Sequence, residues 1–139
     1  MRVVADTNTV VSGLLWTGAP RKVLDAARKG LIQLFTSAAL LVELEDVLGR
    51  DKLAKRLSLI NVSPQELVLG YAALATPVTP LTIPPVIFED PDDDAVLACA
   101  LAAQAEVIVS GDGHMLSLKQ YLGIDILTAP KLIERIPGE

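Results

Sequence analysis

Short apolar runs alternate along the chain with longer segments that have helical periodicity. Four of the runs have the length and composition of buried strands: residues 2–5, 31–36, 107–109 and 124–127. A strand covered on both faces is apolar throughout, because the side chains on each face of the sheet pack against helices. Helical segments lie between the runs, so the pattern favours an α/β fold with a parallel sheet and helices on both faces.

Capping and turn residues place the helices between these strands. We expect helices over 9–15, from 18–20 to Gly30, from Ser37 to about Gly49, over 50–57, from Ser63 to about Ala75, over 95–105, after Asp112 and after Thr128. Between positions 77 and 85, four prolines predict an extended connection without a helix. The last strands follow this connection, so we expect residues 1–139 to form one domain.

An acidic cluster at 89–94 precedes an apolar run from 95 to 105. The run has no polar face, so as a helix it must be buried on nearly all sides, and the acids at its head lie at the edge of the core. Asp90 has the position of an N-cap, and Asp93 follows three residues later. Capping and the helix dipole therefore account for most of the cluster without a functional role.

Asp94 differs from the other members of this cluster. Leu97 and Leu101 follow it at steps of three and seven residues, which predicts that its carboxylate lies on the same helix face as the two leucines. A charge directed at apolar packing is costly unless it is paired or bound to a metal. Asp94 is therefore a candidate metal ligand.

Two further acids follow strands. Asp6 ends the first apolar run, and Asp112 follows the run 107–109 after Ser110 and a glycine. We expect the carboxylates of Asp94 and Asp112 to face one place. Asp6 would lie beyond the carboxyl end of the first strand, where the ligands of open parallel sheets gather. The alternative for Asp6, or for Asn8, is that it only caps the helix over 9–15.

The helix that begins at Ser37 offers another acid. Glu43 and Glu45 border its apolar stripe on opposite sides, at similar angles from the centre of the stripe. Periodicity alone does not choose between them. Asp46 points farther from the stripe, and we expect it to be solvated.

Composition restricts the function classes. The formal net charge of −5 argues against a protein that coats nucleic acid through bulk basicity. Aromatic residues are 4% of the chain, which fits an aliphatic core rather than an aromatic binding platform. Two local basic groups have the alternatives of plain surface, phosphate contact or contact with an acidic partner: Lys52, Lys55 and Arg56, and Arg21, Lys22, Arg28 and Lys29. A single cysteine, Cys99, excludes an internal disulfide framework. With neither a signal-peptide pattern nor a membrane span, a cytoplasmic protein is expected.

The acids in their sequence contexts resemble the PIN-domain family of ribonucleases, and are most similar to its toxin-like, VapC-related prokaryotic branch. The contexts are Asp6 after the first strand, Glu43 in Leu-Val-Glu-Leu, Asp94 in Asp-Asp-Ala-Val-Leu-Ala-Cys-Ala and Asp112 in Ile-Val-Ser-Gly-Asp. The resemblance implies a single PIN-like domain with a five-stranded parallel sheet sandwiched by helices. It also implies endoribonuclease activity with Mg²⁺ or Mn²⁺, and it selects Glu43 over Glu45.

This resemblance assigns roles to the candidate residues. Asp6, Asp94 and Asp112 would hold the metal, and Glu43 would complete its shell and orient the nucleophile. Thr7, Asn8 and Ser110 would support these ligands or contact the RNA substrate, the alternative being turn and cap chemistry. His114 stands near a position where relatives often carry another acid, and could act through a water or on the phosphate. A toxin-like protein would have an antitoxin partner and form a homodimer.

Two other functions compete with this hypothesis. A haloacid-dehalogenase-like phosphatase has an opening motif similar to Asp6-Thr-Asn-Thr9, but Asn8 occupies the place of its second Asp, and Leu116 the place of a later acid. A non-catalytic PIN-like module would bind RNA or a protein partner without cleavage. The departure at His114 and the negative net charge are the features that favour this second alternative.

Overall fold

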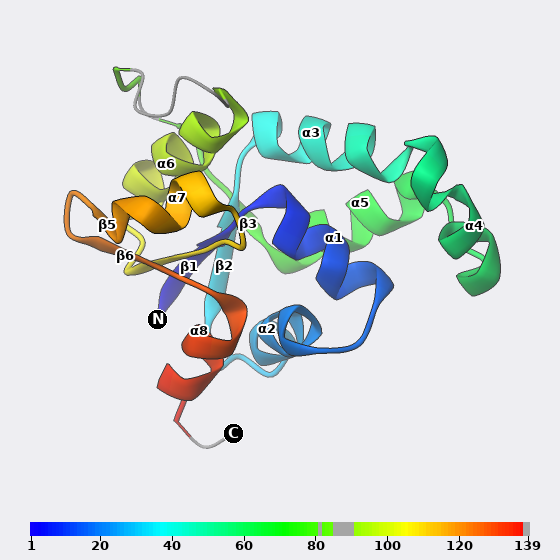
Figure 1. Ribbon diagram of the computed structural model, residues 1–139, viewed down its shortest axis with the longest axis horizontal. Coiled ribbons are helices and arrows are strands. Elements are labelled where there is room, and N and C mark those ends of the chain that lie inside the picture. Colours follow the sequence, from blue (N-terminus) through cyan, green and yellow to red (C-terminus); the bar gives the residue numbers. More distant parts are fainter. Residues whose placement is uncertain (81, 85–90, 138–139) are drawn as a thin grey trace.

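The computed structural model describes residues 1–80, 82–84 and 91–137. Within these residues the chain forms one mixed sheet with the strand order β3-β2-β1-β4-β6-β5 (Figure 1). The strands are β1 (Arg2–Ala5), β2 (Gln33–Thr36), β3 (Thr76–Pro77), β4 (Val107–Val109), β5 (Gln120–Tyr121) and β6 (Ile124–Leu127). All neighbours pair in parallel except β5 and β6, which are antiparallel.

The predicted fold class is confirmed, with one difference in the sheet. Four strands were expected from their apolar runs, and a short fifth parallel strand, β3, lies at the start of the proline-rich connection. The difference is β5, a two-residue antiparallel strand added at the opposite edge. A turn with positive φ at Leu122 and Gly123 joins it to β6, and a strand of this length has no hydrophobic pattern to reveal it.

Eight helices are described, and most of them cover the two faces of the sheet, whereas α4 lies at one end of the molecule, away from the strands (Figure 1). They are α1 (Thr7–Leu15), α2 (Ala19–Arg28), α3 (Ala38–Leu48), α4 (Asp51–Ile60), α5 (Pro64–Leu74), α6 (Pro91–Ala103), α7 (Gly113–Leu118) and α8 (Ala129–Arg135). The capping box at Ser63 is present in full, as predicted. The N-cap expected at Asp90 lies outside the described residues.

Alternate residues of the strands divide the core into two layers. Val3 and Ala5 of β1 pack with α1, α2 and α8 on one face of the sheet. Val4, between them in sequence, packs with α6 and α7 on the other face. This alternation follows from the period of two in a strand, and it requires both faces to be apolar. None of the described helices combines the length and apolar character that a bilayer crossing needs.

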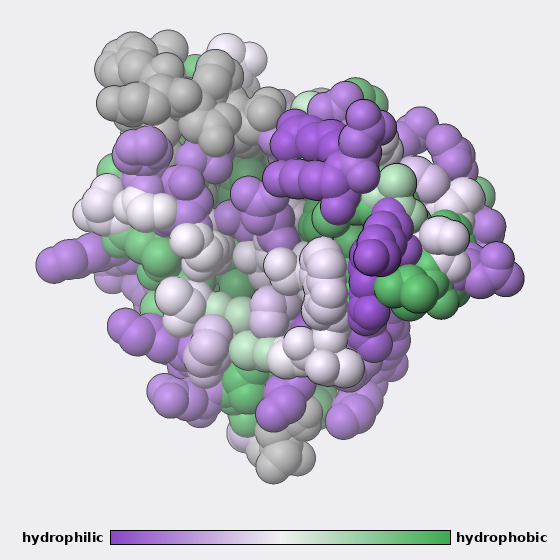
Figure 2. Space-filling view, turned by 45° about the vertical axis from the view of Figure 1, so that its right-hand side comes forward, coloured by the Kyte–Doolittle hydropathy of each residue, from purple (hydrophilic) through white to green (hydrophobic). Residues whose placement is uncertain are grey.

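The surface keeps several large apolar side chains exposed. Val42 on α3, Leu59 on α4 and Leu69 on α5 are each at least 70% exposed. Figure 2 shows hydrophilic residues over most of the face that it draws, with smaller hydrophobic areas between them. Exposed apolar residues that stand singly are ordinary on the surface of a folded protein.

Candidate active site

An acidic pocket of about 130 Å³ lies beyond the carboxyl ends of β1 and β4, two neighbouring strands at the centre of the sheet. Four carboxylates from four separate segments line it: Asp6, Glu43, Asp93 and Asp112. Thr7 and Asn8 also line it, and Val47 and Val96 form its apolar floor. The fold therefore brings acids from positions far apart in the chain to one place, as expected for the ends of parallel strands.

Asp6 caps α1 and also lines the acidic pocket. One oxygen, Oδ1, accepts a hydrogen bond of 2.8 Å from the Thr9 backbone N–H and so caps α1. The other oxygen, Oδ2, accepts from the Ser110 hydroxyl at 2.5 Å. The side chain is 5% exposed, and the two bonds hold it in one orientation at the acidic pocket.

Ser110 connects the acids at the ends of the two strands. Its hydroxyl donates to Asp6 and accepts a 3.0 Å bond from the backbone N–H of Asp112. Asp112 in turn caps α7, since its Oδ2 accepts from the Met115 backbone N–H at 3.0 Å. Because Ser110 is only 1% exposed, it is a fixed link that positions Asp6 and Asp112 relative to each other.

Glu43, rather than Glu45, reaches the acidic pocket. The Thr7 hydroxyl donates a hydrogen bond to Glu43 Oε1, which ties α3 to the first turn of α1. Glu45 is exposed and lines a separate pocket between α3 and the start of α5. The geometry thus agrees with the choice that the family resemblance made.

Asp93, rather than Asp94, lines the acidic pocket from α6. Asp93 is 7% exposed and shares its helix face with Val96, Leu97 and Ala100, which are at most 1% exposed. Asp94 is half-buried and is not among the residues that line this pocket. The acid of α6 that lines this pocket is therefore the neighbour of the one that the sequence pointed to, and a metal-binding role for Asp94 stays a prediction.

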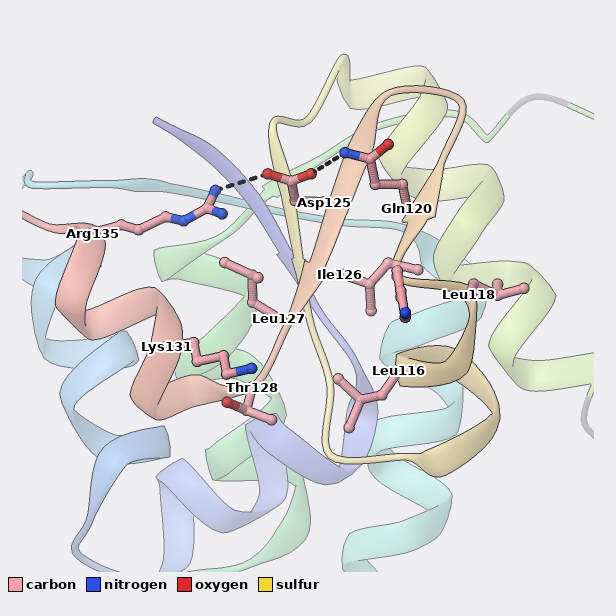
Figure 3. A pocket seen from close by; sticks show the side chains of 10 residues that line it. Leu116, Leu118, Gln120, Asp125, Ile126, Leu127, Thr128, Lys131 and Arg135 are labelled. Carbon is pink, nitrogen blue, oxygen red and sulfur yellow. Dashed lines mark hydrogen bonds and ion pairs between the residues drawn. The ribbon is translucent and has the colours of Figure 1, made fainter.

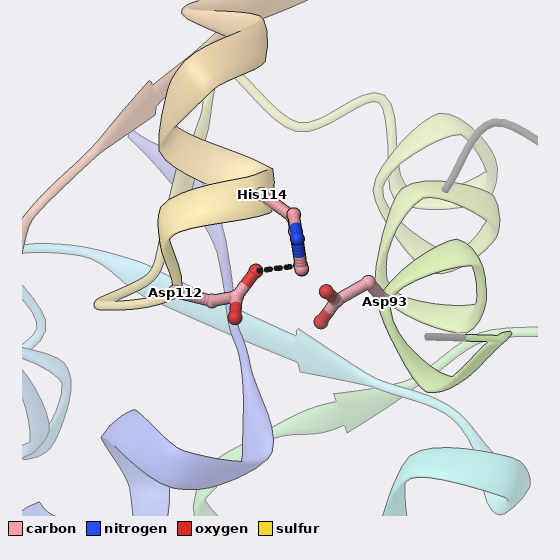
Figure 4. A group of neighbouring side chains, drawn as sticks. All are labelled: Asp93, Asp112 and His114. Atoms are coloured by element: carbon pink, nitrogen blue, oxygen red, sulfur yellow. Dashed lines mark ion pairs between the residues drawn. The ribbon is translucent and has the colours of Figure 1, made fainter. Parts of the chain in front are cut away.

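His114 lies next to Asp93 and Asp112, as Figure 4 shows. Each of the three side chains offers one ligand atom, and these three atoms lie within 4.8 Å of one another. His114 Nδ1 is 4.0 Å from Asp112 Oδ2, and the imidazole is 58% exposed. The imidazole is therefore available to a metal or to a substrate that enters the pocket.

Arg50 also lines the acidic pocket, and the sequence gave no reason to single it out. It is the N-cap residue of α4, and its guanidinium is 3.5 Å from Asp46 in a largely exposed pair. Its position becomes evident only when α3 and α4 are folded against α1. It gives the otherwise acidic pocket one cation that can face an anionic substrate.

The surroundings of Asp112 favour its ionised form. Burial is the largest influence and by itself raises the pKa of this carboxyl. The Met115 N–H, the Asp93 side chain and the charge of His114 act against burial, and together they bring the pKa of Asp112 below its ordinary value. A carboxylate that stays ionised near other acids is suited to bind a cation.

The donor set fits a hard divalent cation. Carboxylate oxygens are the ligands that Mg²⁺ and Mn²⁺ prefer, and crowded carboxylates repel one another until a cation lies among them. Asp93 and Asp112 bring ligand atoms close together, and Asp6 and Glu43 line the same pocket. One histidine with several carboxylates also suits Mn²⁺.

Comparison with known proteins agrees with this geometry. No curated protein sequence matches the chain. A family model described as the PIN domain matches residues 2–114, which include the whole acidic pocket. PIN domains are generally metal-dependent nucleases that act on RNA. Because the match covers most of the chain, the protein belongs to the PIN domain family and is of the nuclease type.

Proposed function

We propose that this protein is a Mg²⁺- or Mn²⁺-dependent endoribonuclease that hydrolyses phosphodiester bonds in RNA. The observation that carries the proposal is the convergence of Asp6, Glu43, Asp93 and Asp112 on one pocket at the centre of the sheet. We also propose that residues 1–139 act as one nuclease domain, because β6 pairs with β4 and Leu132 of α8 is fully buried in the shared core.

Asp93, Asp112 and Asp6 would hold the cation, and Glu43 would complete its surroundings. When bound, a divalent cation polarises the phosphate and lowers the pKa of water, so hydrolysis needs no covalent enzyme intermediate. Ser110 keeps Asp6 and Asp112 in fixed positions, and the Thr7 hydroxyl does the same for Glu43.

Three side chains at the rim would contact the substrate. Asn8 is exposed beside the acids, His114 lies next to Asp112, and Arg50 brings a guanidinium to the same pocket. Neutral and cationic donors of this kind can orient a phosphate and neutralise part of its charge. We assign them positioning of the phosphate rather than proton transfer.

Cleavage of a labelled RNA oligomer with Mg²⁺ or Mn²⁺ tests the proposal, with Asp93→Asn and Asp94→Asn as matched variants. We expect Asp93→Asn to lower kcat at least about 100-fold, which corresponds to about 2.7 kcal/mol of transition-state stabilisation. Asp94→Asn is its neighbour with the same change of charge, and should stay within a few-fold of the unmodified protein.

Three results would contradict this assignment. Wild-type protein that binds RNA but leaves it intact with both metals would indicate the non-catalytic module instead. Efficient turnover of a small phosphate ester in place of RNA would indicate a phosphatase. Loss of activity in Asp94→Asn but not in Asp93→Asn would mean that the acidic pocket is not the catalytic site.

We further propose that the enzyme is the toxin component of a toxin–antitoxin pair in the cytoplasm, and that it forms a homodimer. The family resemblance suggests this role, and the exposed Val42, Leu59 and Leu69 offer apolar surface to an antitoxin or to a second copy. Controlled expression should stop growth, and Asp93→Asn should relieve the arrest. Light scattering on the purified chain should give the mass of a dimer, and growth unaffected by expression would contradict the toxin role.

A further inference from the structure

Three pockets are neighbours on the surface, and each shares lining residues with the next. The acidic pocket shares Asn8 and Asp112 with a pocket of about 470 Å³ between α1, α2 and the start of α8. We call this second pocket the neutral pocket, because Asp112 is the one charged residue among its described lining residues. The neutral pocket shares Thr128 with a third pocket of about 750 Å³ beside β6, α7 and α8. Any extended ligand bound at the acids can therefore continue over Thr128 into the third pocket.

The third pocket, which we call the basic pocket, is lined by Lys119, Lys131 and Arg135 together with one acid, Asp125 (Figure 3). Arg135 donates a 2.9 Å hydrogen bond to Asp125, and Gln120 donates another of 2.8 Å. Figure 3 shows both of these side chains directed at the carboxylate. The Asp125 charge is thus neutralised by Arg135, and the two lysines remain as excess positive charge.

The two lysines are placed to meet an anion. Both are exposed, and among the described residues neither has a carboxylate within 4.0 Å of its amine. Lys131 belongs to the first turn of α8, which Thr128 caps through its backbone and not through its hydroxyl. Lys131 and the Thr128 hydroxyl therefore stand at the junction of the neutral and basic pockets.

This local excess of positive charge contrasts with the formal net charge of the whole molecule, which is −5. An acidic protein repels a polyanion at long range, so an RNA substrate needs a local cationic surface near the site that cuts it. The basic pocket supplies one, and it is linked to the acids through the lining residues of the neutral pocket.

We propose that a single strand of RNA runs from the acidic pocket through the neutral pocket and places a backbone phosphate against Lys131 and Lys119. This inference rests on the proposed ribonuclease function and adds the direction in which the substrate leaves the cutting site. The strand is single because the neutral pocket is lined by small residues such as Ser12, Ala19 and Gly111, which leave room for an unpaired nucleotide. No described lining residue of the three pockets is aromatic, so phosphate contacts rather than base stacking hold the strand.

Fluorescence anisotropy with a labelled RNA of about twelve nucleotides tests the inference, in a chelator so that no cleavage occurs. Lys131→Ala and Lys119→Ala should each weaken binding several-fold. The logarithm of the observed binding constant falls linearly with the logarithm of the salt concentration. Each variant should make this slope less steep by about 0.7, the amount expected for one lost phosphate contact on a single strand. The matched control is Lys55→Ala on α4, which lies at the opposite end of the long axis from β5 and β6 (Figure 1) and should leave this slope unchanged.

A cleavage experiment then locates the contact along the substrate. With metal present, Lys131→Ala should raise KM for the twelve-nucleotide RNA and leave kcat unchanged. A dinucleotide, which has one phosphodiester for the acidic pocket and no backbone phosphate beyond it, should be cleaved equally by Lys131→Ala and the unmodified protein.

The two proposals fail in different ways. The salt slope is measured without cleavage, so it reports on the path even if the protein cuts nothing. If both lysine variants cleave and bind RNA normally, the proposed RNA path is wrong, whereas the proposed ribonuclease function still stands. An equal loss of affinity in Lys55→Ala would also overturn it, because the lysines would then act only through net charge.

Discussion

The acidic pocket and the basic pocket hold their charged groups in opposite ways. In the acidic pocket, Asp6 and Asp93 are at most 7% exposed, and backbone N–H groups fix the orientation of Asp6 and Asp112. In the basic pocket, Lys119 and Lys131 are exposed and belong to the ends of short helices. Groups that must share one small cation need fixed positions, whereas groups that hold a phosphate of a flexible strand can remain mobile.

The largest difference between the two pockets should appear when Mn²⁺ is added. A cation that binds only the folded protein stabilises it by about 2.7 kcal/mol at a hundredfold excess over Kd, which raises Tm by roughly 10 °C for a chain of this size. Asp93→Asn should abolish this rise, and Lys131→Ala should retain it. Differential scanning fluorimetry measures both, and an equal rise in Asp93→Asn would show that the ion binds elsewhere.

Hydrogen bonds in the two pockets should also differ in their contribution to stability. Ser110→Ala leaves the Asp112 N–H and Asp6 Oδ2 without their buried partner, so the free energy of unfolding should fall by about 1–3 kcal/mol. Gln120→Ala removes an exposed bond to Asp125, and its effect should be within about 0.5 kcal/mol. Urea unfolding without metal compares the two, and similar losses would contradict the claim that only the acidic pocket is rigid.

Most of the acidic pocket could be predicted from the sequence because strand ends are easy to locate. Asp6 and Asp112 follow buried apolar runs, and parallel strands bring their carboxyl ends together. Asp93 could not be chosen in the same way. Residues 95–100 of α6 offer no polar face, so the apolar pattern does not indicate which side of the helix faces the core. The neighbouring acids at the start of the helix therefore cannot be told apart from the sequence.

The basic pocket shows what local patterns cannot reveal. Lys119, Lys131 and Arg135 come from the end of α7 and from α8, and share no single helix face. The sequence instead singled out the lysines and arginines of α2 and α4, where spacing along one helix makes a group visible. Charges that converge through tertiary packing, like β5 and its turn, leave no periodic signal.

A smaller effect is expected where α1 meets α3. Thr7→Val keeps the shape of a side chain that is 8% exposed but removes the hydroxyl that donates to Glu43. Loss of one such bond costs about 1 kcal/mol, so kcat should fall roughly fivefold while KM for RNA stays the same. Thr7→Ser, which keeps the donor, should restore the rate. A rise in KM alone would place Thr7 among the substrate contacts, with the basic pocket.

The smallest effect concerns the one carboxylate of the basic pocket. The hydrogen bond from Arg135, and then that from Gln120, lowers the pKa of Asp125. A carboxyl whose pKa is lower in the folded state stabilises the protein above its ordinary pKa, and this contribution is lost as the pH falls through the folded value. The difference in urea midpoint between the unmodified protein and Asp125→Asn should therefore be constant near neutral pH and shrink below about pH 4.

Because the ion pair between Arg135 and Asp125 lies at the surface, with side chains that are 47% and 29% exposed, high salt should reduce the same difference. Asp125→Asn also releases Arg135 and adds one positive charge to the basic pocket, so it should tighten RNA binding in chelator and steepen its salt dependence. A stability difference that grows on acidification would contradict the role of Arg135. Weaker RNA binding would mean that Asp125 holds Arg135 in place for the phosphate, and the basic pocket would then share the fixed geometry of the acidic one.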